Sequence, residues 1–376
     1  MQDVVIIGGG IIGLSVAWRT AQRGATVTVL DPSPGTAATA TAAGMLAPVT
    51  ELHFEGRELL ALNLESARRY PAFAAELADA TGIDVDLRPI GTLAVAWDAA
   101  DLADLRRLHA FQESLGVASA ILTSRELREA EPALAAGLPG GLYAEHDHAV
   151  DNRRVHEALL AAAIKAGVTI HEARAAEITR DGDRVTGVVA EGGERFRAEQ
   201  TVLAAGPWSR DIPGLRGGEA PPVRPVKGQT LRLRAKGSLL NHVVRGFVKG
   251  KPIYMVPRSN GDVVVGATAE EAGFDVRPRA GAIYDLLRDA ATLVPEVTEA
   301  TFVEVSTGLR PGSPDNAPMI GAAAPGLIVA TGHYRNGILL APITGDEVAR
   351  LIIEGDPSPV IAPFGPGRFV RTEVTA

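Results

Sequence analysis

Three glycines and one acid near the start of the chain have types and a spacing suited to binding a phosphate-containing ligand. Gly8, Gly10 and Gly13 form the pattern GxGxxG. In this pattern the first glycine permits a tight turn, the second lets backbone approach a pyrophosphate, and the third allows close helix packing. Asp31 follows the next apolar run, where an acid accepts hydrogen bonds from ribose hydroxyls. These residues predict a dinucleotide site but do not decide between FAD and NAD, because both share the half that the motif recognises.

Two later segments carry groups that could act on a small ligand. Arg310 lies in the sequence GLRP, and a planar guanidinium holds a carboxylate through two parallel hydrogen bonds. Gly332 and Gly337 bracket polar residues before a helix-like run, a turn that can direct N–H groups at a ring carbonyl that gains negative charge. The alternatives are a solvated surface charge for Arg310 and a loop packed for its own geometry for the turn.

The remaining reactive residue types predict no metal site and no thiol chemistry. Cysteine is absent, which excludes disulfides, thiol nucleophiles and a flavin tethered through a thioether. His146, His148 and His333 lack the spacing of a metal site, so structural or surface roles are favoured for them. We assign no acid–base role to a histidine.

A strand, a helix and a second strand must position the glycine motif. Residues 4–7 and 26–30 are short apolar runs rich in β-branched side chains, and residues 11–22 have helical character, which together predict a βαβ unit. Residues 31–48 are rich in Ala, Thr, Gly and Pro and predict a loop or a broken helix. Asp151 resembles the N-cap of a helix that ends at Gly167.

The rest of the chain alternates between predicted helices and strands. Helices are expected at residues 58–80, 100–115, 280–293 and 344–353. Strands are expected at residues 91–97, 201–204, 229–233, 242–248, 253–256 and 263–267. Within residues 168–205 we also expect further strands on either side of a turn at 181–183.

This order predicts two interleaved domains. The fold class is α/β, with a Rossmann-like dinucleotide-binding domain interleaved with an α+β substrate domain built on an antiparallel sheet. We assign residues 1–50, 145–222 and 300–376 to the first domain and residues 51–144 and 223–299 to the second. The chain has 376 residues, of which 46% are hydrophobic, enough for two cores.

Composition argues against nucleic-acid and membrane partners. The formal charge is −8, so no basic surplus exists to attract phosphate backbones or anionic lipid. Residues 4–18 are almost uncharged, but Asp3 and three consecutive glycines distinguish them from a signal peptide. No apolar run approaches the roughly 20 residues of a spanning helix. We therefore expect a water-soluble, cytoplasmic protein.

Several blocks together resemble the D-amino acid oxidase superfamily of FAD-dependent oxidoreductases, and within it the glycine oxidases of thiamine biosynthesis. The similarity extends over nearly the whole chain. The matching blocks are DVVIIGGGIIGLSVAWRTAQRGATVTVLD, TAAGMLAP, AAGPWS, GLRPGSPDNAPMIG and GHYRNGILLAP.

The resemblance implies that the dinucleotide is non-covalently bound FAD and assigns residues to it. These cofactor residues are Gly8, Gly10, Ile11, Ile12, Gly13, Asp31, Ala43, Gly44, Met45, Ala176, Ala205, Gly206, Trp208, Arg310, His333, Arg335, Asn336, Gly337, Ile338 and Leu339. It also implies that Arg310 pairs with the substrate carboxylate, that Tyr254 donates its hydroxyl to the same group, and that Arg335 is a second arginine of the substrate pocket.

In this family a small amino acid gives a hydride to the flavin and becomes an imine, and dioxygen then reoxidises the flavin and forms hydrogen peroxide. From glycine the products are glyoxylate and ammonia, or the imine itself for the thiazole of thiamine. The family often forms homotetramers, so the resemblance also implies a homo-oligomer. Three alternatives stay open: an oxidase for sarcosine or D-amino acids, a quinone-linked amino acid dehydrogenase, and a non-catalytic nucleotide-binding module.

Overall fold

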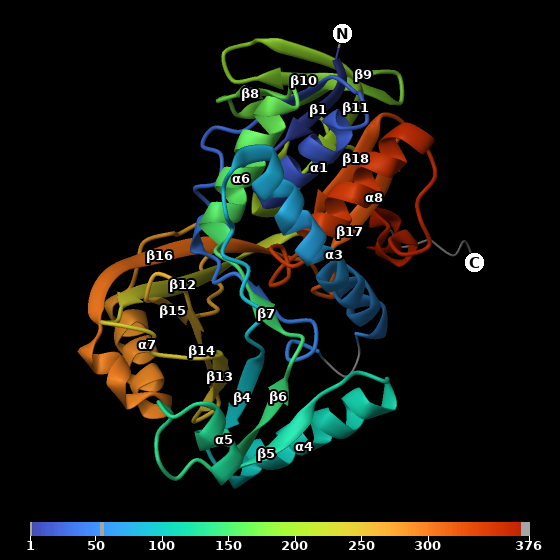
Figure 1. The fold of residues 1–376 in the computed structure, drawn as a ribbon. Helices are drawn as coiled ribbons and strands as arrows, with labels where there is room; N and C mark the ends of the chain where they lie inside the picture. Colours follow the sequence, from blue (N-terminus) through green and yellow to red (C-terminus); the bar gives the residue numbers. More distant parts are fainter. Residues whose placement is uncertain (1, 53–55, 370–376) are drawn as a thin grey trace.

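Two eight-stranded sheets form the framework of the protein. One lies in the upper part and the other in the lower part of the view in Figure 1. The computed structural model describes residues 2–52 and 56–369. Residues 1, 53–55 and 370–376, which fall within the predicted domain ranges, lie outside the described residues. The predicted fold class is confirmed, since one sheet is mainly parallel and the other mainly antiparallel.

The first sheet has the strand order β17-β18-β11-β1-β2-β8. Its strands are β1 (Gln2–Ile7), β2 (Val27–Leu30), β8 (Thr169–His171), β11 (Arg195–Leu203), β17 (Met319–Ala324) and β18 (Leu327–Thr331). All neighbouring pairs are parallel except the edge pair β17–β18. The hairpin of β9 (Ala175–Asp181) and β10 (Arg184–Ala190) joins β11. The order reverses between β1 and β11, which is where such sheets bind dinucleotides.

Four helices pack against one another on the first sheet and bury a common core. They are α1 (Ile11–Ala21), α3 (Arg57–Thr81), α6 (Asn152–Lys165) and α8 (Ala341–Glu354). Asp151 accepts hydrogen bonds from the N–H groups of Arg153 and Arg154, which confirms it as the N-cap of α6. The apolar side chains Tyr70, Phe73 and Leu77 of α3 lie in this core.

The second sheet has the order β16-β12-β15-β14-β13-β4-β6-β5. Its strands are β4 (Thr92–Ala96), β5 (Ala120–Thr123), β6 (Gly140–Ala144), β12 (Arg224–Arg234), β13 (Val243–Val248), β14 (Lys251–Pro257), β15 (Asp262–Gly266) and β16 (Thr301–Gly312). Every pair is antiparallel except β13–β4. The helices α4 (Ala99–Ser114), α5 (Ser124–Ala130) and α7 (Ala280–Leu293) pack on this sheet.

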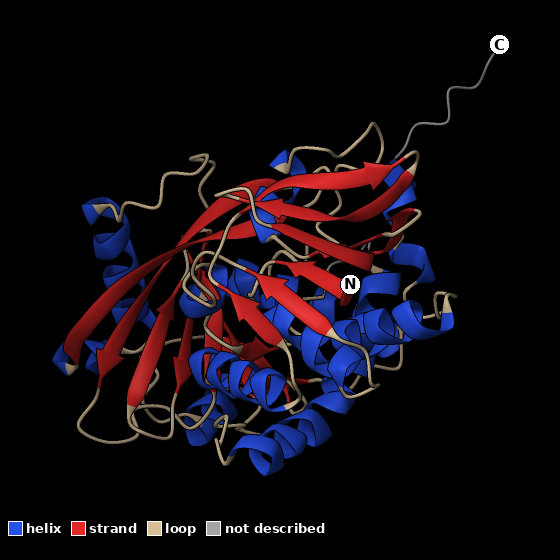
Figure 2. Cartoon of the chain, turned by 90° about the horizontal axis from the view of Figure 1, so that it is seen from above, coloured by secondary structure: helices blue, strands red, loops and turns tan. Residues whose placement is uncertain are grey.

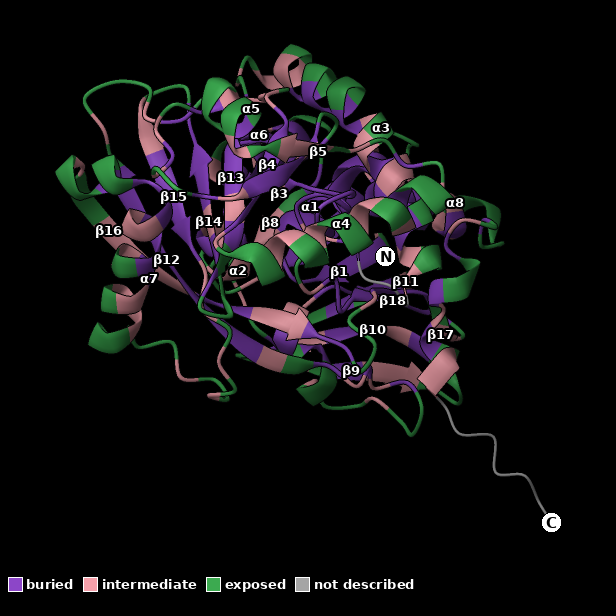
Figure 3. Ribbon diagram, turned by 90° about the horizontal axis from the view of Figure 1, so that it is seen from below, coloured by how far each residue is buried: buried purple, intermediate pink, exposed green. Residues whose placement is uncertain are grey.

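The remaining elements are short. They are α2 (Ala38–Thr41), β3 (Met45–Leu46), β7 (His148–Ala149) and the 3-10 turns Gly206–Asp211, Pro295–Glu299, Ala362–Phe364 and Pro366–Phe369. Strands occupy the middle of the molecule and most helices its periphery (Figure 2). The strands of both sheets are largely buried, whereas the outer faces of the helices are exposed (Figure 3). No helix of the described residues is long and apolar enough to cross a membrane.

The domain boundaries in the structure differ from the predicted ranges at two places. β16 pairs with β12 from Arg234–Thr301 to Arg224–Gly312, so residues 301–312 belong to the second sheet and not to the first domain. α3 packs on α6 and α8, so it belongs with the first sheet although residues 51–144 were assigned to the second domain. Hydrophobic periodicity reveals an element's type but not its packing partner.

Candidate active site

A cavity of about 440 Å³ lies between the two sheets. On one side it is bordered by Gly8, Asp31 and Ala204, which follow β1, β2 and β11 at the carboxyl edge of the parallel sheet. On the other side it is bordered by Tyr254 of β14 and Arg310 of β16. The cavity therefore joins the predicted dinucleotide site to the predicted substrate residues.

In the glycine motif, Gly8 and Gly13 allow close packing, whereas Gly10 leaves the backbone open to the cavity. A Cβ atom at Gly8 would overlap the carbonyl oxygen of Ala204, and one at Gly13 would overlap the carbonyl oxygen of Gly8. A Cβ at Gly10 would have only the Thr39 hydroxyl near it, at 3.5 Å. The backbone at Gly10 is thus open to the cavity, as a bound pyrophosphate requires. The Ile11 N–H donates to the Thr39 hydroxyl at 3.2 Å.

Asp31 holds the glycine turn as well as bordering the cavity. Its carboxylate accepts hydrogen bonds from the N–H groups of Gly9 at 2.6 Å and Ser33 at 2.8 Å. The His156 ring contacts the Gly9 carbonyl at 3.0 Å, and burial lowers the pKa of this histidine. A carboxylate has about four acceptor positions, so Asp31 retains capacity for ribose hydroxyls.

The segment from α2 to β3 is held by side chains that donate to its carbonyl groups. The donor–acceptor pairs are Asn152 to Thr39 at 2.6 Å, Arg153 to Ala40 at 3.1 Å, Thr230 to Thr41 at 3.0 Å and Arg258 to Ala43 at 2.6 Å. The donors come from α6, β12 and the end of β14, so both sheets contribute. These bonds fix the backbone that borders the cavity from residue 41 to residue 45.

Two glycines on neighbouring strands make room for the side chains of Arg310 and Tyr254. A Cβ at Gly228 would overlap the Arg310 guanidinium, and one at Gly266 would approach the Tyr254 hydroxyl at 2.5 Å. Arg310 donates to the Thr268 carbonyl at 3.1 Å and hydrogen-bonds with the Tyr254 side chain. Burial lowers the pKa of Arg310 and raises that of Tyr254, but a guanidinium remains charged in proteins. A cation and a hydroxyl therefore face the same end of the cavity.

Glu51 and Arg335 add opposite charges at this end. Glu51 borders the cavity and forms an ion pair with Arg245 at 2.8 Å. Burial opposes ionisation of Arg335, but Glu51 and Tyr334 outweigh it and raise the pKa of this arginine. The Arg335 guanidinium lies 5.4 Å from the centre of the Tyr334 ring. With two guanidiniums beside the cavity, its environment favours an anionic group.

We expect Tyr254→Phe to raise the KM for a carboxylate substrate about tenfold. The substitution retains the ring but removes a hydroxyl donor, and a hydrogen bond to a charged group contributes about 1.5 to 3 kcal/mol. Steady-state kinetics on the protein loaded with its dinucleotide measure the effect. An unchanged KM would place the Tyr254 hydroxyl outside the substrate contacts.

His333 is buried and neutral, with its Nε2 3.0 Å from the Thr344 hydroxyl. Burial lowers the pKa of His333 from 6.5 to about 3. Between these pH values the unfolded chain binds a proton that the folded chain does not, so stability increases with pH in this window. His333 should thus lower the free energy of unfolding by about 1.4 kcal/mol for each pH unit as the pH falls below 6.5.

Denaturant unfolding of the apoprotein at pH 7, 6 and 5 tests this expectation. His333→Gln, which has no titrating group at this position, should lose stability less steeply than the wild type. Parallel pH profiles for the two proteins would contradict the assignment of His333 as a buried neutral group.

The cavity brings together most of the predicted cofactor residues. Those that border it are Gly8, Gly10, Ile11, Ile12, Asp31, Ala43, Gly44, Met45, Ala205, Gly206, Trp208, Arg310, His333, Arg335, Asn336, Gly337 and Ile338. Three predicted residues do not border it: Gly13, Leu339 and Ala176. Gly13 packs against Gly8, and Leu339 is in the core with its carbonyl accepting from Ser66. The neighbour of Ala176, Ala175, borders the cavity in its place.

Several residues at the cavity were not anticipated from the sequence. Thr39, Glu51, Gly228 and Tyr334 all border it. Thr39 and Glu51 lie just outside the TAAGMLAP block, and Tyr334 lies inside the GHYRNGILLAP block. Gly228 has no local signal because its function is to leave space for a side chain on another strand. Among the described residues, no group of three or more potential metal ligands occurs.

The site's chemistry fits FAD. The backbone at Gly10, Gly206 and Gly337 is free of overlap with other protein atoms, so a ligand can approach it closely. The cavity extends from Asp31 to Tyr254 and the Arg310 guanidinium, a span suited to an extended dinucleotide. A dinucleotide cavity at the switch point of a parallel sheet, faced by a second sheet with an arginine and a tyrosine, is the arrangement of a flavin-dependent oxidoreductase.

The chain belongs to the DAO family of FAD dependent oxidoreductases, whose family model matches residues 3–351. Within that family it is similar to glycine oxidases. The Geobacillus kaustophilus glycine oxidase is 37% identical over 372 residues, covering 98% of this chain and 97% of that protein. A crystal structure of glycine oxidase from that organism has a TM-score of 0.91, covering 98% of each chain. The resemblance to the glycine oxidases is thus confirmed, and FAD is the family's cofactor.

Some relatives are longer proteins. The bifunctional protein ThiO/ThiG of a Nostoc species is 37% identical over 366 residues, which are 96% of this chain but 54% of that protein. A Trichormus variabilis protein of the same name is covered to 56%. The chain therefore spans about half the length of these bifunctional relatives.

Proposed function

We propose that the protein oxidises the carbon–nitrogen bond of glycine or a similarly small amino acid. The overall reaction is glycine, dioxygen and water to glyoxylate, ammonia and hydrogen peroxide. The observation that carries the proposal is the position of Arg310 and Tyr254, which face the cavity together from the second sheet. The glycine oxidases to which the chain is similar support the choice of substrate.

The chain's own residues bind and orient the amino acid. Arg310 takes the carboxylate in a charge-assisted pair, Tyr254 donates its hydroxyl to the same group, and Arg335 adds a second positive charge. When bound, FAD would supply the two-electron oxidation and would pass the two electrons to dioxygen. Fixed orientation of the substrate in the cavity accounts for catalysis, and no proton-abstracting side chain is required when the amine reacts in its neutral form.

The cofactor is held at both ends by this chain. Gly10 and the start of α1 face the pyrophosphate, Asp31 accepts from the ribose, and the 332–338 segment and Ala43–Met45 border the ring. These assignments follow the cavity wall described above. The polar backbone of the 332–338 turn lies where negative charge develops on the ring.

The decisive experiment is to add glycine to the purified protein without air and to record the visible spectrum. Bleaching of the oxidised flavin, followed in air by peroxide and glyoxylate, supports the proposal. Bleaching by sarcosine or D-alanine alone would assign a different amine substrate. Turnover with artificial acceptors but little peroxide would identify a dehydrogenase, and bound FAD that no amine reduces would leave a nucleotide-binding module.

The ThiO/ThiG relatives support a role in supplying the glycine imine for the thiazole of thiamine. A homo-oligomer, with a tetramer as the family's frequent form, and a cytoplasmic location stay predictions. Light scattering of the FAD-loaded protein measures the oligomeric state.

A further inference from the structure

We propose that Arg258 is a positioning residue of the flavin site, acting through the peptide between Ala43 and Gly44 without touching the ligand. The inference rests on the proposed placement of the flavin ring beside residues 43–45. Arg258 follows the last residue of β14, the strand that also carries Tyr254. Its guanidinium therefore connects the sheet of the substrate residues to the wall of the cofactor cavity.

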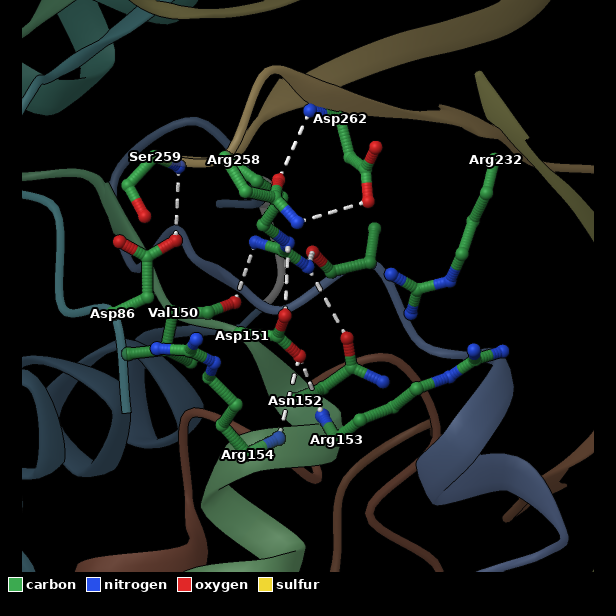
Figure 4. A network of polar contacts seen from close by, with 12 residues as sticks. Asp86, Val150, Asp151, Asn152, Arg153, Arg154, Arg232, Arg258, Ser259 and Asp262 are labelled. Atoms are coloured by element: carbon green, nitrogen blue, oxygen red, sulfur yellow. Dashed lines mark hydrogen bonds and ion pairs between the residues drawn. The ribbon is translucent and has the colours of Figure 1, made fainter. Parts of the chain in front are cut away.

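The Arg258 guanidinium reaches two segments of the first domain from the second sheet. One Nη donates to the Val150 carbonyl at 2.6 Å, and the other donates to the Ala43 carbonyl at 2.6 Å and to the Asn152 side-chain oxygen at 3.1 Å. Figure 4 shows the Arg258 side chain directed into the space between the start of α6 and its own strand end. The residue is 4% exposed, so these bonds are shielded from water.

These contacts determine which way the 43–44 peptide faces. The Ala43 carbonyl is directed at Arg258, and the Gly44 carbonyl accepts from the Val150 N–H at 2.9 Å. Because a trans peptide is planar, the Gly44 N–H is directed opposite to the Ala43 carbonyl. Within the part of the chain that the structure describes, no acceptor bonds this N–H, and Gly44 borders the cavity. The N–H is thus available to a ligand.

The local backbone could not maintain this orientation by itself. Gly44 has φ of +74°, which only glycine adopts readily, and a Cβ there would overlap the Val150 carbonyl. A glycine peptide without its carbonyl partner can rotate and would then present a carbonyl dipole to the ring in place of an N–H. Arg258 prevents this rotation by holding the Ala43 oxygen.

Stability alone does not explain a guanidinium at this position. The nearest carboxylate oxygen, on Asp151, is 3.9 Å from the Arg258 Nε. The Asp151 carboxylate is already engaged as the N-cap of α6. The Nε atom is buried without a hydrogen-bond partner. Buried charges with such incomplete pairing often stabilise less than well-packed apolar side chains would. The geometry therefore points to orientation of the cavity wall as the reason for the charge.

The test compares Arg258→Met and Arg258→Lys with the wild type in FAD affinity, visible spectrum and midpoint potential of the bound flavin. We expect Arg258→Met to weaken FAD binding at least about tenfold and to shift both the spectrum and the potential at saturating FAD. Arg258→Lys keeps the charge but cannot donate to both carbonyls from a planar guanidinium. Its FAD affinity, spectrum and potential should therefore lie between those of the wild type and Arg258→Met.

Arg180→Met is the matched control. Arg180 is a partly buried arginine, with its side chain 10% exposed. It pairs with Glu219 and donates to the carbonyls of Gly214 and Asp183, away from the cavity. The Arg180→Met substitution should lower the thermal midpoint of the apoprotein without changing the flavin spectrum. If Arg258→Met binds FAD within about threefold of the wild type and leaves spectrum and potential unchanged, the proposal is overturned. Should Arg258→Met fail to fold, the same measurements on Arg258→Lys decide.

The test is independent of glycine oxidation. A wild-type protein that binds FAD but is not bleached by glycine would remove the proposed function and leave the role of Arg258 to be judged by affinity and spectrum. A wild type that oxidises glycine, together with an Arg258→Met flavin like that of the wild type, would remove only the role of Arg258.

Discussion

Arg310→Ala is expected to lower kcat/KM for glycine by roughly two to three orders of magnitude while the protein still binds FAD. Arg310 lies within the cavity, shielded from bulk water, and removing one partner of such a hydrogen-bonded charge pair costs about 2 to 5 kcal/mol. That cost corresponds to a decrease in kcat/KM of about thirtyfold to several thousandfold. The loss should appear mainly in KM, because the guanidinium binds the substrate carboxylate before as well as during the reaction.

A second variant separates the position of the guanidinium from its charge. In Gly228→Ala the new methyl group would overlap the Arg310 guanidinium, which is the flexible end of a side chain and can move aside. The protein should therefore fold, keep its cation and show a smaller rise in KM, of roughly tenfold. Arg310→Ala with an unchanged KM for glycine would remove Arg310 from the substrate site, whatever Gly228→Ala does.

Gly13→Ala is expected to produce a protein that no longer retains FAD during purification. The added methyl group would overlap the carbonyl oxygen of Gly8. The backbone fixes the positions of both groups, so no side-chain rotation can relieve the overlap. Helix α1 must then move away from the end of β1, which displaces the helix N-terminus that faces the cavity. We expect a loss of about 3 kcal/mol or more in stability, and FAD binding weaker by roughly a hundredfold.

The control for this substitution is Gly217→Ala. A Cβ at Gly217 meets no protein atom within 4 Å, and its φ lies outside the left-handed region. It should retain FAD like the wild type and change the thermal midpoint little. FAD content from the visible spectrum and affinity from titration of the apoprotein provide the measurements. Normal FAD binding by Gly13→Ala would show that α1 has freedom to shift that the packing does not indicate.

Features that depend on neighbouring residues were accessible from the sequence. The helix that Asp151 caps, the helix at residues 280–293 and the strand-helix-strand unit around the glycine motif occur where their local patterns predict them. The GxGxxG spacing and Asp31 also indicated a dinucleotide, since the turn, the helix N-terminus and the acid lie within one βαβ unit. Matching blocks then extended the assignment to the other cavity segments.

Features that depend on contacts between distant segments required the folded chain. The place of β16 in the second sheet and the space that Gly228 leaves for Arg310 depend on pairing between strands about 80 residues apart in sequence. The bonds that Arg258 donates to Val150 and Ala43 likewise join residues 108 and 215 positions apart in the sequence.

The sequence by itself determined the local chemistry: a nucleotide-binding turn, the helix that Asp151 caps and the residue types able to hold a carboxylate. The tertiary structure decided which of these groups meet in one cavity, which are buried there, and which way the backbone around Gly44 faces. The physical reason is that hydrogen bonding within a turn or helix involves near neighbours, whereas burial and side-chain geometry arise only when remote segments exclude water together.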